Sequence, residues 1–474
     1  MAARAGRLLR GRPADAGAPP RGDAGAVDLS WADEFIRNVR PYIFVREEDG
    51  LLIKKPNQAH RLNPQGVRVL QFLLEGGTAE QLLERVGPGE QRAADVALFL
   101  YEVRRCLDGT LRETNHTRAV EVRPLEVNFS PLPVLSEVAI TSRCNLRCAF
   151  CYGACSGTGH PAHARAEMTA EEVERILSRI FQQARVPSVS FTGGEPALRP
   201  DLCRLVDYAR GLGLRVNLIT NGTLITAALA RDLAAAGLDS AQVSLEGVTA
   251  AAHDAVTGIP GSFDRTLAGV RHLMGCGIPV HTNTTLNRRN FEDCRQMPRF
   301  VHDELGLEKL SMNLVIPSGT ALVHEDLLVR YIEVGPLVQG ALEESRRLGV
   351  ELMWYSPTPL CLFNPILHAL GNKGCGACDG LLSVDCRGNV LPCSSCADPV
   401  GNLLQSDFAD IWGSPHATAY RRKGLSHPQC RECDSFPACH GACPLYWRHF
   451  GFDELTRSQG FRPVDWREVE EGLR

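Results

Sequence analysis

Between about residues 134 and 354 the chain alternates short apolar runs with longer amphipathic ones. The amphipathic runs have helical spacing and include Glu171–Ala184, Leu224–Ala236 and Phe263–Cys276, the first with a capping box at Thr169 and Glu172. Alternation of this kind predicts an α/β fold whose parallel strands are joined by crossover helices. The predicted strands are Val138–Ile140, Val189–Phe191, Val216–Ile219, Gln242–Leu245, Val280–Leu286, Leu310–Val315 and Val350–Trp354.

The pattern before this region is different. Tyr42–Val45 and Leu51–Lys54 predict two strands joined through Asp49-Gly50, a hairpin signal. A helix comes next and ends at Gly76-Gly77, and a capping box from Thr78 to Gln81 begins another. Strands followed by short helices predict a winged-helix-like module, which we place at residues 31–115.

The flanking regions lack strong periodicity. Residues 1–30 are rich in Ala, Gly, Pro and Arg without a sustained apolar core, which predicts a disordered tail rather than a secretory signal. Residues 357–474 are rich in Cys, Gly and Pro. We expect this last region to lack a large apolar core and to be held together by metal. Residues 116–356 then form the α/β domain.

The polar and glycine-rich motifs of the α/β domain all come directly after predicted strands. After the first strand comes the sequence ITSRCNLRCAFCY, and after the second Thr192-Gly193-Gly194-Glu195-Pro196. Thr220-Asn221-Gly222 and Glu246-Gly247 come after the third and fourth strands. Because the carboxyl ends of parallel strands share one edge, we expect these loops to line a single mouth.

The first of these loops carries Cys144, Cys148 and Cys151 in the spacing C-x3-C-x2-C. Three thiolates on one tight loop can hold three irons of a cubane cluster that normally takes four cysteines, which leaves one iron open. The alternative is a zinc site, which usually needs four protein ligands; Cys155 could supply the fourth.

Composition narrows the class of protein. The 474 residues carry a net charge of −4, which gives no reason to expect nucleic acid or an anionic membrane as a partner. No apolar run approaches the roughly 20 residues of a membrane-spanning helix. Because the N-terminus is not a convincing secretory signal, we expect a cytoplasmic location as the default. Clustered cysteines in a reducing compartment favour metal or catalysis. The isolated Cys106, Cys203, Cys276 and Cys294 are interpreted as small buried hydrophobes.

The C-x3-C-x2-C loop followed at a distance by Gly-Gly-Glu resembles the radical S-adenosylmethionine (SAM) superfamily. That resemblance implies a partial (β/α)6 TIM-like barrel and a [4Fe–4S] cluster on the three loop cysteines, with SAM chelating the open iron. Electron transfer into SAM then releases a 5′-deoxyadenosyl radical. The residues implied to bind SAM are Gly193, Gly194 and Glu195, with Ser244 for the ribose and Glu246 and Asn283 as further candidates.

The later cysteines resemble the SPASM extension of that superfamily. Cys378 is followed by nine residues, Gly388, four residues and Cys393, and then by Cys430-x2-Cys433-x5-Cys439-x3-Cys443. The resemblance implies one auxiliary cluster on Cys375, Cys378, Cys393 and Cys443, and another on Cys430, Cys433 and Cys439.

The second auxiliary set is one ligand short, because no cysteine comes after Cys443. Cys396, Cys386 or Asp453 could complete it, or one iron stays open for substrate. Zinc on a close pair such as Cys393 and Cys396 is the alternative. Cys361 has no assignment.

The N-terminal module resembles the PqqD-like, or RiPP recognition element, domain. The residues that carry this likeness are the run Leu51–Arg61, then Leu62-Asn63 and the helix from Gly66 to Leu74. In that family a three-stranded sheet is followed by helices, and a leader peptide adds as an extra strand in a groove. A DNA-binding or purely structural winged helix is the alternative.

Together the three parts predict a radical SAM maturase of a ribosomally made peptide, reduced by flavodoxin or ferredoxin. It would form a thioether or carbon–carbon cross-link, or a related product of hydrogen abstraction. The alternatives are a sulfatase-type protein maturase, a tetrapyrrole side-chain modifier and an iron–sulfur carrier without catalysis. Sulfatase maturases usually place an acidic residue after the second auxiliary cysteine, where this chain has Ser394.

Overall fold

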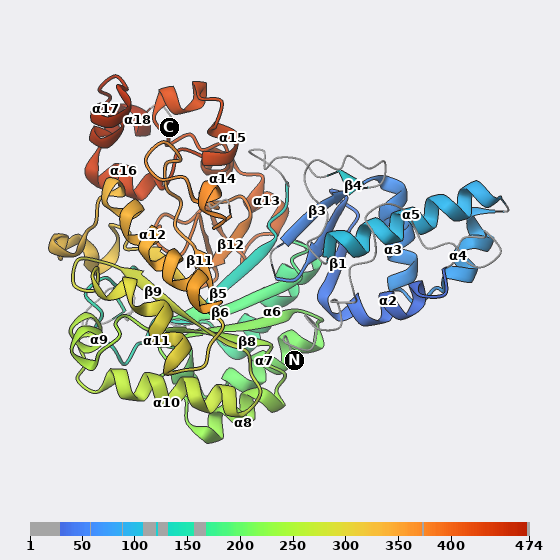
Figure 1. The fold of residues 1–474 in the computed structure, drawn as a ribbon, viewed down its shortest axis with the longest axis horizontal. Coiled ribbons are helices and arrows are strands. Elements are labelled where there is room, and N and C mark those ends of the chain that lie inside the picture. The colour runs from blue at the N-terminus through green and yellow to red at the C-terminus, as the bar shows by residue number, and fades with distance from the viewer. Residues whose placement is uncertain are drawn as a thin grey trace. The chain divides into compact units, whose positions relative to one another are not determined.

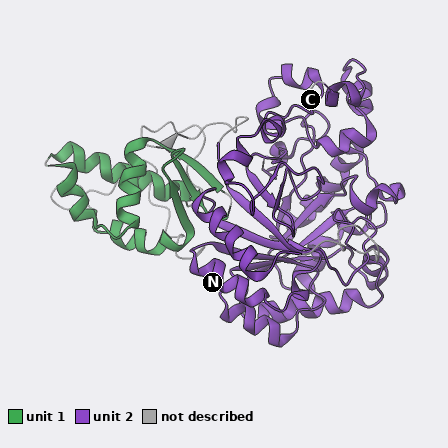
Figure 2. Ribbon diagram, turned by 180° about the vertical axis from the view of Figure 1, so that it is seen from behind, with its two compact units in different colours: residues 1–124 green, residues 125–474 purple. Residues whose placement is uncertain are grey.

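A computed structural model of the chain describes residues 29–471 apart from 57, 88, 108–119, 122–130, 156–166 and 372–373. The chain divides into unit 1, residues 1–124, and unit 2, residues 125–474, which Figure 2 colours separately. The predicted tail, residues 1–30, lies outside the described residues except for Leu29 and Ser30. No described helix is long and apolar enough to cross a bilayer.

Unit 1 is an antiparallel sheet with helices. The sheet order is β1-β2-β3-β4, formed by Ile43–Arg46, Leu51–Lys54, Gln58–Leu62 and Val120–Glu121. The predicted hairpin is confirmed, since Arg46 pairs with Leu51 across a turn in which Gly50 has a φ of +68°. The helices are α2 (Ala32–Val39), α3 (Pro64–Leu74), α4 (Ala79–Val86) and α5 (Glu90–Leu107).

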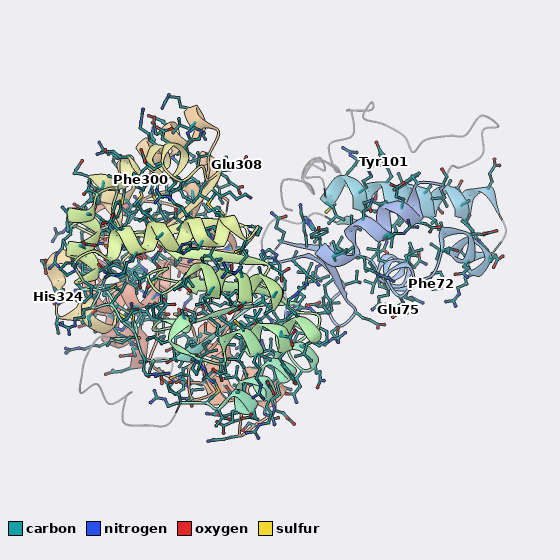
Figure 3. The ribbon with its side chains drawn as sticks, turned by 90° about the horizontal axis from the view of Figure 1, so that it is seen from below. Phe72, Glu75, Tyr101, Phe300, Glu308 and His324 are labelled. Atoms are coloured by element: carbon teal, nitrogen blue, oxygen red, sulfur yellow. The ribbon has the colours of Figure 1, made fainter. Side chains whose placement is uncertain are left out.

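Two helices of unit 1, α3 and α4, begin at side-chain caps, and the helices bury their apolar faces. Asn63 accepts a hydrogen bond from the Gly66 N–H at 2.7 Å and so starts α3. Phe72 of α3, labelled in Figure 3, lies 4.1 Å beneath the Arg85 guanidinium of α4. The buried residues of α2, α3 and α5 form one core with β1 and β2.

Both predicted capping boxes are confirmed. Thr78 accepts from the N–H of Gln81, whose side chain accepts from the Thr78 N–H. Thr169 and Glu172 do the same at the start of the first helix of unit 2. Each box satisfies two backbone donors that have no partner inside the helix.

Unit 2 is built on a ten-stranded sheet in the order β11-β10-β9-β8-β7-β6-β5-β12-β13-β14. Strands β5 to β11 are parallel, and each predicted strand overlaps one of them. The order is linear, so the barrel is open, as predicted. The strands are Leu135–Thr141 (β5), Ser188–Gly193 (β6), Arg215–Thr220 (β7), Ser240–Ser244 (β8), Val280–Leu286 (β9), Lys309–Leu314 (β10) and Glu351–Trp354 (β11).

Crossover helices cover the outer face of this sheet (Figure 1). They are α6 (Ala170–Gln182), α7 (Leu202–Gly211), α8 (Ala227–Ala235), α9 (Ala250–Thr257), α10 (Ser262–Gly275), α11 (Met297–Asp303) and α12 (Tyr331–Leu348). Val138, Phe191 and Leu218 pair across β5, β6 and β7 and are buried in the core that these helices share. The outer face of the sheet is therefore apolar.

The opposite, inner face is polar. Polar side chains are aligned across neighbouring strands, each one residue away from the apolar row. They are Ser383, Glu137, Ser190, Asn217 and Ser240. Asn217 donates to Ser190 at 3.3 Å and accepts from Ser240 at 2.7 Å. The strand period of two thus separates a packed exterior from a hydrogen-bonding lumen.

The expectation that residues 357–474 lack a large apolar core is wrong. Three of their segments extend the main sheet: β12 (Leu381–Val384) runs parallel to β5, and β13 (Asn389–Leu391) and β14 (Gly401–Asn402) continue it antiparallel. Buried aromatic residues such as Trp412, Trp447 and Phe452 belong to the same core as the barrel. This core could not be recognised from the sequence, because short helices and turns show no clear periodicity of apolar residues.

The remaining helices belong to the C-terminal region. They are α13 (Phe408–Trp412), α14 (Pro415–Arg421), α15 (Phe436–Cys439), α16 (Pro444–Phe450), α17 (Asp453–Gln459) and α18 (Trp466–Glu471).

Helices α16 and α17 are fixed to the N-terminus of α12. The backbone N–H of Tyr331 donates to the Tyr446 hydroxyl at 3.0 Å, and that of Ile332 donates to the Glu454 carboxylate at 3.0 Å. Tyr446 also donates to Glu454, and the rings of Tyr331 and Tyr446 stack at 3.8 Å. A buried carboxylate at a helix N-terminus satisfies free N–H groups and favours the helix dipole.

Glu454→Ala should destabilise unit 2 by about 2–3 kcal/mol, because the Ile332 N–H and the Tyr446 hydroxyl lose a charged acceptor inside the protein. Asp453→Ala is the matched control, since Asp453 is exposed and its ion pair with Arg457 lies at the surface. Urea unfolding followed by tryptophan fluorescence measures both. Equal losses for the two variants would contradict the role given to Glu454.

Candidate functional site

The three cysteines of the C-x3-C-x2-C motif lie on the loop of residues 142–155, directly after β5. Backbone hydrogen bonds hold this loop on two sides. The N–H groups of Arg147 and Ala149 donate to the last turn of α9 at 2.9 and 3.1 Å, and the Thr320 N–H donates to the Cys151 carbonyl at 2.9 Å. The loop is thus positioned by the α/β scaffold rather than by secondary structure of its own.

The thiols of the loop are close enough to influence one another. Burial raises the pKa of Cys144 to about 11, and Glu195 and Cys151 add to the rise. Burial also raises the pKa of Cys148, with Cys151, Glu246 and Cys144 as further causes. Metal ligation requires these thiols to lose their protons, so metal binding here releases protons.

Cys155 lies beside the motif. Its thiol hydrogen-bonds to the Cys151 sulfur and lowers the pKa of Cys151 to about 6, while the pKa of Cys155 itself is raised. The Cys155 N–H also donates to the Cys151 sulfur at 3.5 Å. Cys155 therefore supports a thiolate at Cys151.

Gly193 and Gly194 pack directly against the cysteine loop. A Cβ atom on Gly193 would lie 2.2 Å from the Thr141 carbonyl oxygen, and one on Gly194 would lie 2.1 Å from that of Arg143. The Gly194 N–H donates to Thr141 and the Glu195 N–H to Arg143, both at 2.8 Å. The side-chain positions of Gly193 and Gly194, two residues implied to bind SAM, are thus filled by the loop's own backbone.

Glu195 is fully buried and joins two loops of the mouth. Its carboxylate accepts from the Thr220 hydroxyl at 2.7 Å, the Asn221 N–H at 2.8 Å and the Ala197 N–H at 3.0 Å. Burial raises the pKa of Glu195, and these hydrogen bonds oppose the rise. Asn221 in turn donates to Asn145 of the cysteine loop at 3.0 Å.

Ser244 and Glu246 lie at the end of β8, and Asn283 lies in the middle of β9, where it pairs with Ser244. Ser244 is the last residue of β8 and is half-buried. Glu246 accepts from the Thr285 N–H at 2.9 Å, and burial raises its pKa to about 8, so its carboxyl is neutral at pH 7. The Asn283 amide donates to Asn313 at 2.8 Å.

Glu137 is a candidate that was not predicted from the sequence. It lies on the inner face of β5 and accepts from the Ser383 hydroxyl at 2.6 Å. Desolvation raises the pKa of Glu137, and hydrogen bonds from Ser383 and Ser394 oppose this rise. Its charge also helps to raise the pKa of Tyr152, which comes directly after Cys151. The signal available in the sequence was one acidic residue inside an otherwise strand-like apolar run.

Five later cysteines gather in the C-terminal region. Four of them line one pocket: Cys375, Cys393, Cys396 and Cys443. Cys378 is fully buried beside them; burial raises its pKa to about 12, and Cys375 and Cys396 contribute to the rise. The structure thus brings together the predicted set and adds Cys396 to it.

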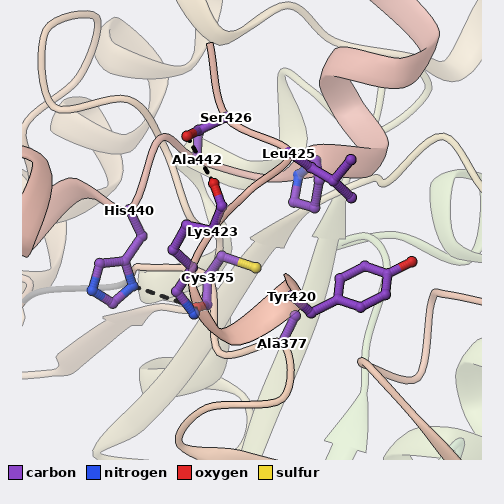
Figure 4. A pocket seen from close by; sticks show the side chains of 9 residues that line it. Cys375, Ala377, Tyr420, Lys423, Leu425, Ser426, His440 and Ala442 are labelled. Carbon is purple, nitrogen blue, oxygen red and sulfur yellow. Dashed lines mark hydrogen bonds between the residues drawn. The ribbon is translucent and has the colours of Figure 1, made fainter. Parts of the chain in front are cut away.

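Positive charge lies next to this first auxiliary group. Figure 4 shows Lys423 and His440 beside the Cys375 backbone, and the buried Lys423 ammonium donates to the Cys375 carbonyl at 2.6 Å. Lys423 also pairs with Asp379 at 2.9 Å. A lysine in this position favours thiolates nearby.

Cys430, Cys433 and Cys439 form a second group on the turns that lead into and through α15. The Cys433 N–H donates to the Cys430 carbonyl at 3.2 Å. The Cys439 sulfur accepts from the Leu360 N–H at 3.4 Å. Burial raises the pKa of Cys430 to about 12, and the neighbouring thiols add to the rise.

The three residues considered as a fourth ligand of this second group lie elsewhere. Cys396 lines the pocket of the first auxiliary group. The Cys386 carbonyl accepts from the Met168 N–H at 2.9 Å, near the first cysteine loop. Asp453 is exposed and pairs with Arg457 at 3.3 Å.

The donor sets fit iron–sulfur clusters. In the described part of the chain no three Cys, His, Asp or Glu side chains surround the place of a single metal ion. Thiolates around one zinc ion lie about 4 Å apart, whereas a cluster takes one thiolate for each of several irons. The cysteine groups described above supply the thiol ligands that such clusters take.

Family models match two parts of unit 2. Residues 138–301 match the radical SAM superfamily, and residues 375–434 match SPASM, described as an iron–sulfur cluster-binding domain.

Two kinds of relative are similar in sequence. A PqqA peptide cyclase of Streptomyces rochei is 31% identical over 319 residues, which cover 65% of this chain and 83% of that protein. An AdoMet-dependent heme synthase of Methanosarcina barkeri is 29% identical over 339 residues, 65% of this chain and 90% of that protein.

The fold is similar to that of SuiB of Streptococcus suis, solved with its precursor peptide SuiA. The TM-score is 0.62 at 16% identity, over 85% of this chain and 95% of that chain. Since 85% of 474 residues is about 403 and unit 2 has 350, the likeness extends into unit 1.

Gly194→Ala should displace the cysteine loop, because the new methyl group meets the Arg143 carbonyl at 2.1 Å and backbone cannot yield as a flexible side chain does. We expect the affinity for iron, measured after anaerobic reconstitution, to fall about tenfold. Losses of this size are typical when the residues that position metal ligands are disturbed. Iron and sulfide analysis with competing chelator measures it.

Gly211→Ala is the control, since no atom lies within 4 Å of its Cβ position at the end of α7. This variant should bind iron as the wild type does. Equal iron loss in both variants, or none in either, would contradict the close packing of Gly194 as the cause.

Proposed function

We propose a function on the premise that the chain belongs to the radical SAM superfamily and carries an SPASM iron–sulfur cluster-binding domain. The chain is accordingly an enzyme with a [4Fe–4S] cluster that binds SAM, and with auxiliary iron–sulfur clusters. Its function is the modification of a ribosomally synthesised peptide by a thioether or carbon–carbon cross-link, or by related hydrogen-abstraction chemistry. Unit 1 would hold the leader of that peptide.

The proposal rests first on the outer edge of strand β3 in unit 1. The Leu62 N–H donates to the Gly50 carbonyl at 2.7 Å and so points toward β2. The N–H groups of Ala59 and Arg61, an odd number of residues away, point to the other side. On that side, among the described residues, β4 pairs with Arg61 and Leu62 but not with Ala59.

An edge that the described residues leave unpaired at Ala59 is a surface to which an extended peptide can add as a further strand. The relatives support the same substrate class: one is a peptide cyclase, and the structural neighbour holds a precursor peptide. The extent of the structural likeness into unit 1 adds to this support.

In unit 2, Cys144, Cys148 and Cys151 would hold the SAM-binding cluster. Glu195 and Ser244 would contact SAM from neighbouring strand ends, and Gly193 and Gly194 would do so through backbone groups, since the loop fills their side-chain positions. When bound, the cluster and SAM supply a 5′-deoxyadenosyl radical that takes a hydrogen atom from the peptide. The polar inner face of the barrel would accept the peptide's reacting segment.

A cross-link joins two atoms that each lose a hydrogen. One hydrogen leaves as an atom to the deoxyadenosyl radical, and the other leaves as a proton with one electron. The auxiliary clusters would accept the electron, held by the two cysteine groups of the C-terminal region. Glu137 would accept the proton, since its carboxyl lies on the inner face of β5 and carries a raised pKa.

Modification of a tetrapyrrole side chain is the second candidate. It is favoured by the likeness to AdoMet-dependent heme synthases, which are 27–29% identical to this chain. A tetrapyrrole substrate needs no strand edge in unit 1, so the two functions separate when that edge is altered.

The test uses the reconstituted full chain with the short peptide encoded beside its gene and SAM under reducing conditions. We expect a mass change in the peptide with 5′-deoxyadenosine as co-product, measured by mass spectrometry. Ala59→Pro should raise the KM for the peptide about tenfold, because proline removes the outward N–H without breaking the β2–β3 ladder.

Ala59→Val is the matched control, because it retains the N–H and should leave the KM unchanged. SAM cleavage without peptide should be the same in all three proteins. Unchanged peptide mass throughout, or turnover of a porphyrin that Ala59→Pro does not affect, would refute peptide maturation and favour the tetrapyrrole candidate.

Glu137→Gln should lower product formation about a hundredfold while SAM cleavage continues, since proton transfer by a placed side chain contributes at least that much. In the wild type the rate of product formation should rise with pH as Glu137 loses its proton. This rise should be absent in Glu137→Gln. Ser383→Ala removes a hydrogen bond to the ionised carboxyl and should move the rise to higher pH. Wild-type turnover by Glu137→Gln would exclude the role.

A further inference from the structure

Cys361 stands apart from both cysteine patterns in the sequence, fourteen residues before Cys375. In the fold it lies at a turn between β11 and the auxiliary region. The N–H groups of Leu362 and Phe363 both donate to the Pro359 carbonyl, at 2.9 and 3.0 Å. This closes a tight turn with Cys361 inside it.

Contacts on both sides fix this turn against the second auxiliary group. The N–H of Leu360, the residue before Cys361, donates to the Cys439 sulfur at 3.4 Å. The Cys361 carbonyl accepts from the Gln459 side chain of α17 at 3.3 Å. Such N–H donors to a ligand sulfur are a recurrent part of iron–sulfur sites.

The electrostatics place the Cys361 thiol among the same residues. Burial raises the pKa of Cys361 to about 11, with Cys439 and Cys433 as further causes. For Cys430 the causes after burial are Cys439, Cys361 and Cys433. Thiols influence each other in this way only at short range.

We propose that Cys361 is the fourth protein ligand of the second auxiliary cluster, together with Cys430, Cys433 and Cys439. The three other candidates lie elsewhere, in the first pocket, near the first cysteine loop and on the exposed side of α17. The ligand thus comes from before the cysteine-rich pattern rather than from after it.

A closed ligand set has a functional consequence. With a cysteine for each of its four irons, the second cluster has no open iron for a substrate thiolate. The residues that hold this cluster would then leave no iron open for substrate, and the chemistry left for it to supply would be electron transfer. This assignment goes beyond the proposed peptide chemistry and stands whether the substrate is a peptide or a tetrapyrrole.

Differential alkylation of the reconstituted holoprotein tests the assignment. Cys361 and Cys433 are exposed, so iodoacetamide can reach both when they are free, and alkaline pH offsets the raised pKa of Cys361. We expect Cys361 to be protected together with Cys430, Cys433 and Cys439 in the holoprotein, and to react at least about tenfold faster once chelator has removed the iron. Peptide mass mapping gives the extent at each site.

Cys361→Ala supplies the second measurement. It should make the second cluster about tenfold more sensitive to chelator, followed by iron content and by the EPR signal after reduction. Cys203→Ala, a half-buried cysteine on α7, is the matched control and should match the wild type. Cys396→Ala should leave the protection of Cys430 unchanged.

Two outcomes overturn the proposal. One is alkylation of Cys361 at equal rates with and without iron while Cys430, Cys433 and Cys439 are protected. The other is loss of that protection in Cys396→Ala but not in Cys361→Ala. Neither readout depends on turnover, so failure here is distinct from failure of the proposed function.

Discussion

The cysteine loop depends on a backbone contact that only glycine permits. Thr141 and Arg143 approach Gly193 and Gly194 so closely that any side chain there would overlap a carbonyl oxygen. The contact is set by the pairing of β5 with β6, whose register shifts between Ala139 and Thr141. A bulge of this kind bends a strand and redirects the residues after it. The pairing of β5 with β6 therefore positions the three thiols, and the loop that carries them needs no regular secondary structure.

Burial governs the chemistry of the mouth. Desolvation favours neutral forms, so the thiols Cys144 and Cys148 and the carboxyl of Glu246 have raised pKa values. When the thiols ionise on binding iron, a charged Glu246 would add repulsion next to Cys148. A neutral carboxyl avoids this repulsion and can donate a hydrogen bond. The same low polarity keeps water from a radical, as such chemistry requires.

Local patterns in the sequence predicted the features that depend on neighbours in the chain. Apolar runs located the strands, and the pairs Thr78/Gln81 and Thr169/Glu172 located helix starts, since capping is decided within four residues. The clustering of cysteines on loops was predicted from their spacing in the same way. Features that depend on distant segments were missed. Glu137 gains its hydrogen-bond partner Ser383 only because β12 pairs with β5. The turn at Cys361 contacts Cys439, which lies far away in the sequence. The apolar core of the C-terminal region was missed because aromatic residues on short helices leave no measurable period.

Long-range pairing also joins the two chemical centres of unit 2. Strand β5 leads to the first cysteine loop, and β12 lies beside it and leads to Cys393. Glu137 connects the two, because its carboxyl accepts from Ser383 on β12 and from Ser394, the residue after Cys393. At the other side, Glu454 and Tyr446 secure the auxiliary region to α12. These two contacts join the barrel to the auxiliary region on both sides, so the position of Glu137 relative to the first cysteine loop is set by strand pairing.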